Sequence, residues 1–274
     1  MSGFSCPVCG GPLIRGDRTL SCGKGHSFDL ARQGYVNLLR SNRSSAKRHG
    51  DDRAMVQART AFLEAGYYAP LREALCELAL RYTGEQVKLL DVGCGEGWYT
   101  VGLKAALEEQ GRTCIAWGID ISREALIQCA RRDRTLGLAV ASVNALPVPD
   151  GSMDLVLNVF APNDDGEFHR CLRPGGVLLR AVPLEDHLLG LKEAVYDRPY
   201  RNPAPEYQPQ GFTLLERREV RGRITLKSRE EIVSLFRMTP YWYKTGREDQ
   251  EKLDRLDSLE TQIGFCIFCH RKQI

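Results

Sequence analysis

The sequence has 274 residues, of which 43% are apolar and 27% charged, as is ordinary for a globular chain with one large domain and a small appendage. It has no run of about 18 apolar residues and no apolar stretch at its start, so neither a membrane span nor an export signal is expected. The net charge of +3 is unevenly spread, because residues 1–50 hold eight of the 38 Lys and Arg residues but only two of the 35 acidic ones.

The basic start of the chain favours either a module that binds a polyanion or a solubilising head. Ten cysteines occur in the sequence. Because we expect a cytoplasmic protein, in which thiols stay reduced, clustered cysteines indicate a metal rather than disulfides.

Residues 1–35 are predicted to form a zinc-binding ribbon. Cys6 and Cys9 lie in one tight turn, CPVC, and Cys22 and His26 lie in a second short knuckle, CGKGH. Four ligands of this kind suit tetrahedral Zn²⁺, and since the protein fills all four positions the zinc is structural rather than catalytic. The metal then supplies much of the folding energy of so short a segment. The alternative, four unrelated side chains, is disfavoured by the paired spacing.

Residues 36–80 are predicted to be a basic linker followed by connecting helices. The part from 40 to 53 is rich in Ser, Lys and Arg without an apolar period, which is typical of a loop. Its cations either contact phosphates or are merely solvated; they are Arg40, Arg43, Lys47, Arg48 and Arg53. Helical periodicity follows over residues 54–82, with breaks near Gly66 and Pro70.

Residues 81–274 are predicted to form the main domain, an α/β fold with a doubly wound, mostly parallel sheet. A short apolar strand over 87–92 leads into the glycine loop GCGEG and an amphipathic helix. The further strands are expected over residues 114–120, 138–142, 153–161 and 173–182, with helices over 122–133 and 164–172 between them. The tail reads as final antiparallel strands with helices between them. Ligands of such sheets bind beyond the carboxyl ends of the strands.

The glycine loop and the ends of the next two strands predict a nucleotide-containing ligand. The loop is G-x-G-x-G without a following Lys-Ser/Thr, which excludes a P-loop. Asp120 ends the second strand, where a carboxylate can accept ribose hydroxyls, cap a helix together with Ser122, or do both. Residues 142–147 end the third strand, beside the expected purine. The predicted contacts are Asp91, Gly93, Gly97, Asp120, Asn144, Ala145 and Leu146.

The segments LDVGCGEGW, GIDIS, NALPVPDGSMDLV and LRPGG together resemble class I S-adenosylmethionine-dependent methyltransferases over about residues 85–183. With the ribbon, QGYVNLL, ARTAFLEAGYYAPL, NVFAP and MTPYW, the whole chain resembles the bacterial 23S ribosomal RNA guanine-N1-methyltransferase family. NVFAPN is closer to the branch tied to tylosin-type macrolide resistance. The resemblance implies a Rossmann-like domain with a mostly parallel seven-stranded sheet and a small N-terminal zinc ribbon.

The resemblance also implies the activity: methyl transfer from S-adenosylmethionine to N1 of a guanine in a hairpin loop of 23S ribosomal RNA. It implies that the zinc ribbon helps to recognise this RNA and that a homodimer presents a joint cleft. Cofactor contacts are carried over to Tyr68, Gly95, Glu96 and His187. Tyr67 is the alternative to Tyr68 as the tyrosine that contacts the cofactor. His187 follows a strand end and is either a cofactor contact or a plain residue at a helix N-terminus.

Methylation at N1 sets further requirements, because this nitrogen carries a proton and lies on the pairing edge of the base. The base must be unpaired or flipped out, and a carboxylate or imidazole must accept the proton. The candidates, among which the sequence does not choose, are Asp164, Asp165, Glu185, Asp186 and His187. Asn158 and Pro162 in NVFAP are predicted to face the substrate.

Two segments allow two interpretations each. Residues 196–212, rich in Pro and aromatic residues, either cover the active site or form a simple crossover. The stretch TPYWYK over 239–244 either stacks RNA bases or packs in the core. For the whole chain, two other functions stay open: a small-molecule methyltransferase with a structural zinc cap, and a non-catalytic RNA-binding module.

Overall fold

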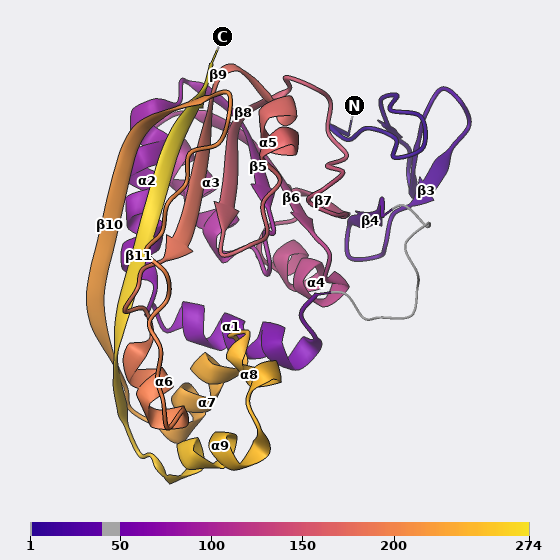
Figure 1. Ribbon diagram of the computed structural model, residues 1–274. Coiled ribbons are helices and arrows are strands. Elements are labelled where there is room, and N and C mark those ends of the chain that lie inside the picture. Colours follow the sequence, from indigo (N-terminus) through magenta and orange to yellow (C-terminus); the bar gives the residue numbers. More distant parts are fainter. Residues whose placement is uncertain (1, 40–49, 274) are drawn as a thin grey trace.

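The computed structural model of the chain describes residues 2–39 and 50–273 (Figure 1). The predicted phosphate contacts that lie outside the described residues are Arg40, Arg43, Lys47 and Arg48. A three-stranded antiparallel sheet at the start of the chain belongs to the ribbon and consists of β1 (Ile14–Arg15), β2 (Thr19–Ser21) and β3 (Ser27–Asp29).

A second, eight-stranded sheet forms the centre of the molecule, with the order β10-β11-β9-β8-β5-β6-β7-β4. β11 alone runs against its neighbours, so the predicted mostly parallel sheet is confirmed. The strands are β4 (Tyr35–Asn37), β5 (Gln86–Val92), β6 (Thr113–Asp120), β7 (Gly137–Val140), β8 (Met153–Val159), β9 (Leu172–Pro183), β10 (Phe212–Leu226) and β11 (Leu259–Lys272). Residues 89–92 of β5 and 155–159 of β8 are buried without interruption, as parallel strands covered on both faces require.

The eighth strand, β4, corrects the expected count of seven. It comes from QGYVNLL, just after the ribbon, and pairs in parallel with β7, Val36 opposite Ala139. Val36 is fully buried. β7 would otherwise end the sheet with unpaired backbone groups, and β4 satisfies them. The segment that leaves the ribbon is thereby built into the central sheet.

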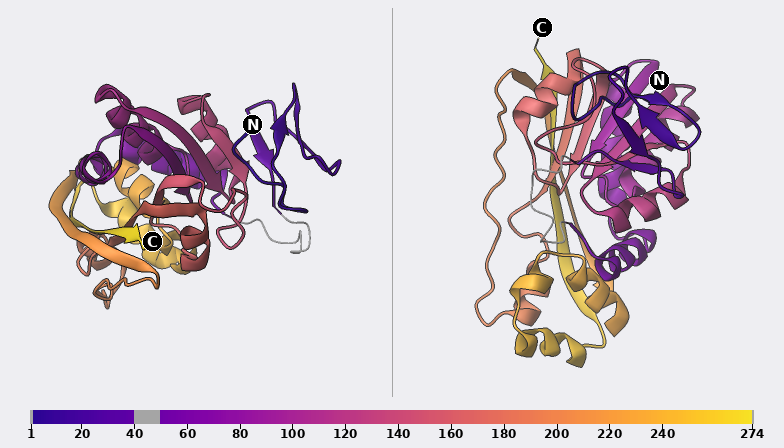
Figure 2. Two further views of the ribbon diagram at one scale, coloured as in Figure 1. Left: turned by 90° about the horizontal axis from the view of Figure 1, so that it is seen from above. Right: turned by 90° about the vertical axis from the view of Figure 1, so that its right-hand side faces the viewer.

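Helices cover one face of this sheet, and other elements cover the opposite face (Figure 2). The first face is packed by α2 (Ala69–Tyr82), α3 (Trp98–Glu109) and α4 (Arg123–Arg132). The second is packed by α5 (Asp165–Cys171), the ribbon and the crossover between α6 (Leu189–Val195) and β10. The crossover interpretation of residues 196–212 is confirmed, since Tyr207 packs against Phe268 of β11 and none of these residues borders the cavity described below.

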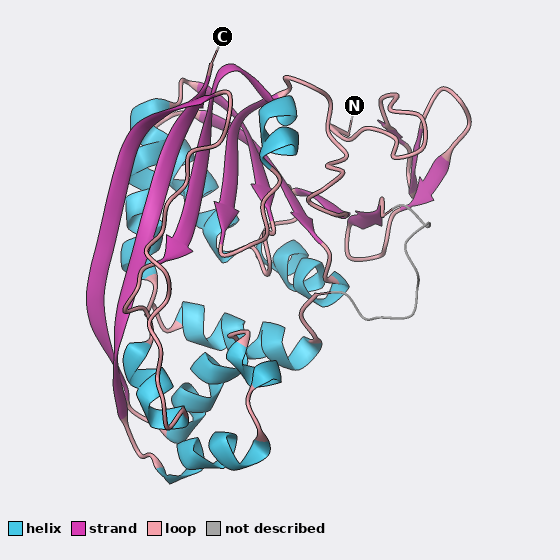
Figure 3. Cartoon of the chain, in the orientation of Figure 1, coloured by secondary structure: helices cyan, strands magenta, loops and turns pink. Residues whose placement is uncertain are grey.

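A layer of helices lies across the carboxyl ends of the parallel strands, as Figure 3 shows below the sheet. This helical cap consists of α1 (Arg53–Glu64), α6 (Leu189–Val195), α7 (Arg229–Arg237), α8 (Tyr241–Lys244), α9 (Arg247–Glu251) and a 3₁₀ turn (Lys252–Arg255). α1 begins at Asp52, whose side chain accepts from the Met55 N–H, and the predicted break occurs at Gly66, which has φ +82°. No helix in residues 2–39 and 50–273 is long and apolar enough to cross a membrane.

The ribbon docks on the sheet through Trp117 of β6. The Trp117 indole N–H donates to the Ser2 carbonyl at 3.0 Å. A side chain on Gly3, which has φ +81°, would come within 2.4 Å of the indole ring, so only glycine allows this approach. The Ser5 N–H donates to the Pro147 carbonyl at 2.8 Å. Phe4, Leu13 and Leu20 of the ribbon share one buried apolar cluster with Trp117, so ribbon and sheet form one core.

Candidate active site and metal centre

The ribbon brings Cys6, Cys9, Cys22 and His26 together, with all four ligand atoms within 4.8 Å of one another. Cys9 Sγ lies 3.6 Å from Cys22 Sγ, and His26 Nδ1 lies 3.5 Å from Cys6 Sγ and 3.3 Å from Cys22 Sγ. Ligands of a tetrahedral zinc ion stand roughly 3.5 Å apart, because Zn–S and Zn–N bonds are about 2.3 and 2.0 Å long. The spacing and softness of these donors therefore fit Zn²⁺, with no open position for a substrate.

The second site is a cavity of about 1060 Å³ between the helical cap and the carboxyl ends of β5, β6, β8 and β9. Such a volume accommodates a ligand of the size of a nucleoside with an amino-acid extension. Its walls come from the strand ends and the loops that follow them, from α1 and Tyr68, and from the segment 238–243. The cavity lies where ligands of open α/β sheets bind.

The glycine loop forms the cavity wall at the end of β5. Gly93 and Gly95 have φ +80° and +55° and both border the cavity. A Cβ on Gly93 would lie 2.3 Å from Cβ of Ala161, so the loop packs directly against the turn after β8. Gly97 does not border the cavity: a Cβ there would meet Cys129 Sγ at 2.5 Å, so it serves the packing of α3 on α4.

Two acidic residues near this loop have different surroundings. Asp91 lies behind the cavity wall, where it accepts from the Thr100 hydroxyl, and burial raises the pKa of its carboxyl to about 7. Glu96 borders the cavity, and its carboxylate pairs with Arg132 at 2.5 Å. Asp91 does not border the cavity, so its position does not support the predicted cofactor contact.

Asp120 borders the cavity at the end of β6. Its Oδ2 accepts from the Gly95 N–H at 2.9 Å and its Oδ1 accepts from the Ser122 N–H at 2.8 Å. Burial raises the pKa of this carboxyl. Ser122 itself caps α4 by accepting from Ala125. Both carboxylate oxygens of Asp120 keep a further lone pair for hydroxyl donors of a ligand.

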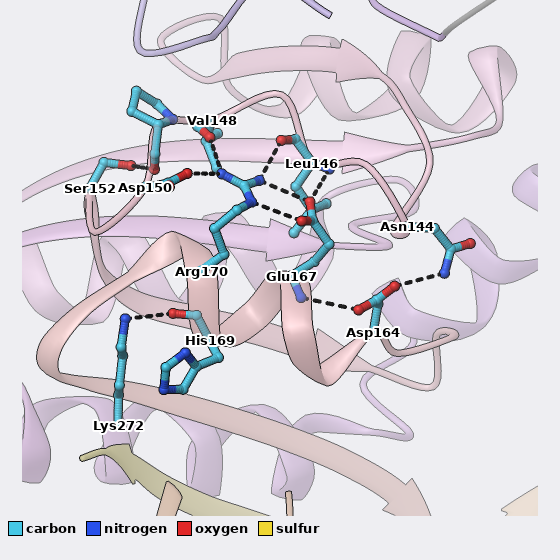
Figure 4. A network of polar contacts seen from close by, with 11 residues as sticks. Asn144, Leu146, Val148, Asp150, Ser152, Asp164, Glu167, His169, Arg170 and Lys272 are labelled. Carbon is cyan, nitrogen blue, oxygen red and sulfur yellow. Dashed lines mark hydrogen bonds and ion pairs between the residues drawn. The ribbon is translucent and has the colours of Figure 1, made fainter. Parts of the chain in front are cut away.

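The loop after β7 places one predicted contact at the cavity and two away from it. Asn144 borders the cavity and donates to Asp164 at 3.0 Å. Ala145 and Leu146 do not, because the backbone of Leu146 is turned to α5: its N–H donates to Glu167 at 2.6 Å and its carbonyl accepts from Arg170. Figure 4 shows this network. Asn144 is therefore the one predicted contact of this loop that borders the cavity, beside Ala141, Ser142 and Val143.

Tyr68 and His187 meet at the cavity wall opposite Asp120. The Tyr68 hydroxyl lies 3.2 Å from His187 Nε2, and the Gly264 N–H donates to His187 Nδ1 at 3.2 Å. Burial lowers the pKa of His187 to about 3, so its imidazole is neutral. Because Nδ1 accepts, Nε2 carries the proton and donates to Tyr68. Of the two tyrosines, Tyr68 borders the cavity, whereas Tyr67 donates to Glu231 at 2.8 Å.

The other candidate proton acceptors are engaged elsewhere and do not border the cavity. Asp164 accepts from Asn144 and from the Glu167 N–H as the cap of α5 (Figure 4). Asp165 accepts from the Tyr207 hydroxyl at 2.6 Å. Asp186 pairs with Arg221 at 3.0 Å, as Glu185 does at 3.8 Å. These hydrogen bonds and ion pairs were not visible from the positions of the four residues in the sequence.

Pro162 and Asn158, which were predicted to face the substrate, lie in different surroundings. Pro162 borders the cavity. Asn158 is fully buried, and its amide donates to the carbonyls of Val92 at 3.0 Å and Pro162 at 3.1 Å. Asn158 does not border the cavity, and its two hydrogen bonds tie the turn after β8 to the glycine loop.

Arg59 and Phe160 border the cavity and were missed by the sequence analysis, whereas the segment TPYWYK was singled out there. Arg59 of α1 is the one Lys or Arg on the cavity wall in the described part of the chain; it pairs with Asp51 and donates to the Met238 carbonyl at 3.1 Å. Phe160 lies at the end of β8. In the stretch TPYWYK, Tyr241 and Tyr243 border the cavity, while Trp242 packs on Phe236. Only helical periodicity marked α1, and nothing local connects it with the glycine loop.

Three features define the class I S-adenosylmethionine-dependent methyltransferases: a parallel sheet with one reversed strand, a glycine loop after β5 and an acid at the end of β6. This chain has all three, and a zinc ribbon precedes them. The family described as "Methyltransferase domain" matches residues 89–176, and the one described as "RlmA, N-terminal" matches residues 4–47. The chain belongs to the 23S ribosomal RNA (guanine-N1)-methyltransferase family, as its similarity to three relatives shows.

The first relative, the 23S rRNA (guanine(748)-N(1))-methyltransferase of Streptomyces fradiae, is 42% identical over 193 residues, 69% of this chain and 66% of its own length. A putative 23S rRNA (guanine-N(1)-)-methyltransferase of Micromonospora griseorubida is 38% identical, over 68% of this chain and 67% of its own. One from Bacillus subtilis is 31% identical over 98% of this chain and 97% of its own. The matched region thus spans about two thirds of the first two relatives and nearly all of the third.

Proposed function

We propose that the protein transfers a methyl group from S-adenosylmethionine to N1 of a guanine in a hairpin loop of 23S ribosomal RNA. The observation that carries this proposal is the cavity in which the glycine loop meets the turn after β8, in a chain that aligns over 98% of its length with a putative 23S rRNA (guanine-N1)-methyltransferase. An RNA substrate of this kind also supports a cytoplasmic location.

The cavity walls support a particular orientation of the cofactor. Asp120 and Asn144 offer acceptor and amide groups to the nucleoside end, on the β6 and β7 side of the glycine loop. Arg59 offers the guanidinium that pairs with the cofactor carboxylate, since charge-assisted contacts to Arg are strong and geometrically specific. Tyr68, held by His187, keeps its hydroxyl proton free to donate toward the amino-acid end.

S-adenosylmethionine supplies an electrophilic methyl group, which needs no metal. The acidic residues bordering the cavity within the described ranges are Asp51, Glu96 and Asp120, and each is already bonded by protein groups. His187 is neutral, with its acceptor nitrogen occupied by Gly264. Catalysis by this chain therefore rests chiefly on positioning the base beside the methyl group. When N1 forms its bond to the methyl carbon, the bond from that carbon to sulfur breaks and leaves S-adenosylhomocysteine, and the N1 proton passes to bulk water. His187 acts as a positioning residue for Tyr68.

The ribbon supports an RNA partner through its unpaired surface charge. Its exposed cations form no ion pair with any described residue; they are Arg15, Arg18, Lys24 and Arg32. Exposed cations without acidic partners suit phosphate contacts. We propose that the docked ribbon presents these charges to the hairpin, and that two chains associate to complete the RNA cleft. Light scattering of the purified protein with and without the hairpin tests the dimer.

The proposed activity is tested with methyl-labelled S-adenosylmethionine and an unmodified 23S ribosomal RNA hairpin, followed by nucleoside mass spectrometry. We expect 1-methylguanosine, and no label in a hairpin whose loop guanines are replaced by adenine. Label in small metabolites only would instead identify a small-molecule methyltransferase with a structural zinc cap. Cofactor binding without any transfer would identify a non-catalytic RNA-binding module.

A further inference from the structure

Phe160 has a backbone conformation that a bulky side chain rarely adopts. Among the described residues, two that are not glycine have positive φ, Phe160 at 54° and Leu188 at 58°, and both border the cavity. Leu188 is buried, but Phe160 is 42% exposed. An aromatic residue held in the left-handed region costs conformational free energy, and such strain gathers at functional sites.

The surrounding contacts hold this conformation in place. The Phe160 N–H donates to the Ala181 carbonyl of β9 at 3.1 Å. Asn158 fixes both sides of the turn through the carbonyls of Val92 and Pro162. The next residue, Ala161, fills the space that Gly93 leaves open. The turn is therefore fastened to the glycine loop, and the position of the Phe160 ring is coupled to the cofactor cradle.

The ring of Phe160 rests on an aromatic floor. It lies nearly parallel to the His187 imidazole, with 6.2 Å between centroids and 24° between planes. Tyr68 meets it edge-on at 6.2 Å, and Phe265 of β11 lies 5.6 Å away. These contacts prevent the ring from folding back into the core. Its exposed part borders the cavity and offers an apolar surface to a ligand.

The strand order separates this surface from the nucleoside end of the cofactor site. Asp120 and Asn144 follow β6 and β7, on one side of the glycine loop after β5. Phe160 and His187 follow β8 and β9, on the other side. The ring of Phe160 therefore lies beyond the adenosine contacts, at the amino-acid end of the cofactor site. In this position it faces the acceptor of the methyl group rather than the adenine.

We propose that Phe160 is the stacking platform for the flipped guanine, a deduction that rests on the proposed function. A flat, sequence-tolerant π surface is what proteins use to hold an unstacked base. Stacking on Phe160 fixes the plane of the base, while its coupling to Gly93 through Ala161 sets the distance between base and cofactor. Asn158 is then a positioning residue that acts through the turn.

The test compares Phe160→Leu, Phe160→Tyr and Phe160→Gly with the wild type. For each we would measure KM for the hairpin, kcat, the affinity for S-adenosylhomocysteine by calorimetry, and the melting temperature. We expect Phe160→Leu to raise KM for RNA roughly ten- to hundredfold, as the loss of one base–aromatic stack predicts. The affinity for S-adenosylhomocysteine stays unchanged, and Phe160→Tyr restores KM.

Phe160→Gly separates stacking from structure. Glycine adopts φ 54° without strain, so we expect undiminished thermal stability together with the KM defect of Phe160→Leu. Tyr200, which is 51% exposed and away from the cavity, provides the matched control Tyr200→Leu, with wild-type KM.

Three results would overturn the stacking role. They are a wild-type KM for RNA in Phe160→Leu, an equal loss of cofactor affinity in that variant, and a Tyr200→Leu defect of the same size. If the wild type itself leaves the hairpin unmethylated, the proposed function fails and the assignment of a guanine to Phe160 fails with it. Wild-type methylation with unaffected Phe160 variants removes only the stacking role.

Discussion

The Gly264 N–H points at Nδ1 of His187 from 3.2 Å and thereby decides which nitrogen of the imidazole carries the proton. Nε2–H is left to donate to Tyr68, and the Tyr68 hydroxyl proton is left for the cavity. A backbone group of β11 thus sets the hydrogen-bonding character of a tyrosine that lies far from it in the sequence. This arrangement requires a neutral imidazole, and neutrality can be measured.

We expect the wild type to lose stability relative to His187→Gln as pH falls from about 6.5 toward about 4. The unfolded imidazole takes up a proton in this range, whereas the buried one stays neutral down to about pH 3. The unfolded state therefore binds up to one more proton than the folded state. The free energy of unfolding then falls by at most about 1.4 kcal/mol for each pH unit. Urea unfolding of both proteins over this range measures the difference, in which acid effects on the zinc site cancel. A pH-independent difference would show that His187 is charged.

Arg59→Met is expected to weaken binding of S-adenosylhomocysteine roughly ten- to hundredfold, the usual effect of losing a hydrogen bond to a charged group. Binding of 5′-methylthioadenosine, which lacks the amino-acid part, should not change. The comparison separates a carboxylate contact from the structural contacts of Arg59 with Asp51 and Met238. Asp120→Asn serves as the control, because it should weaken both ligands. An equal loss of both ligands in Arg59→Met would remove the carboxylate role.

Gly93→Ala should destabilise the protein by about 1–3 kcal/mol and abolish measurable cofactor binding. Its φ of +80° strains any side chain, and the new Cβ would stand 2.3 Å from Ala161. Gly84→Ala is the matched control, since a Cβ there meets nothing within 4 Å. Thermal unfolding and calorimetry measure the two effects. Full cofactor affinity in Gly93→Ala would mean that the loop does not need its close approach to the turn after β8.

Cys22→Ser is expected to remove the zinc and to loosen the ribbon from the sheet, because the metal supplies much of the folding energy of this segment. Trp117 lies under the ribbon and is 8% exposed, so its emission should shift to longer wavelength. Metal analysis and tryptophan fluorescence measure both effects. Cys76→Ser, outside the cluster, should keep the metal and the spectrum. An unchanged emission after complete removal of the metal would indicate that docking does not depend on zinc.

The double variant Arg15→Gln, Arg18→Gln should weaken RNA binding at low salt. It should also make the slope of log affinity against log salt concentration shallower. We expect a change of about one for each phosphate that the ribbon no longer neutralises. The matched control is Arg247→Gln, an exposed cation on the helical cap. Binding of the hairpin at several salt concentrations, in full-length protein, gives the slope. An unchanged slope in the double variant would leave the ribbon with a structural role.

The zinc ligands and the glycine loop were predictable because each motif specifies its own geometry over a few residues. Two tight knuckles place Cys6, Cys9, Cys22 and His26 around one point. Alternating apolar strands and amphipathic helices likewise indicated the sheet. The eighth strand was not visible, since the three residues of β4 are too short to carry a strand signal and form one only against the free edge of β7.

The residues around the ligand depended on contacts between distant segments. Sequence position alone offered Asp164, Asp165, Asp186 and His187 equally, and only the fold shows that His187 borders the cavity. Chain order also left Arg59 and Phe160 unnoticed. α1 crosses the ends of the strands because the helical cap packs there, and the turn at Phe160 is fixed by Asn158 and Ala181. The amino-acid sequence by itself determined the cofactor class, the metal and the fold, since those patterns are local. Tertiary structure decided which side chains face the ligand, because burial and hydrogen bonds between remote segments set their orientation.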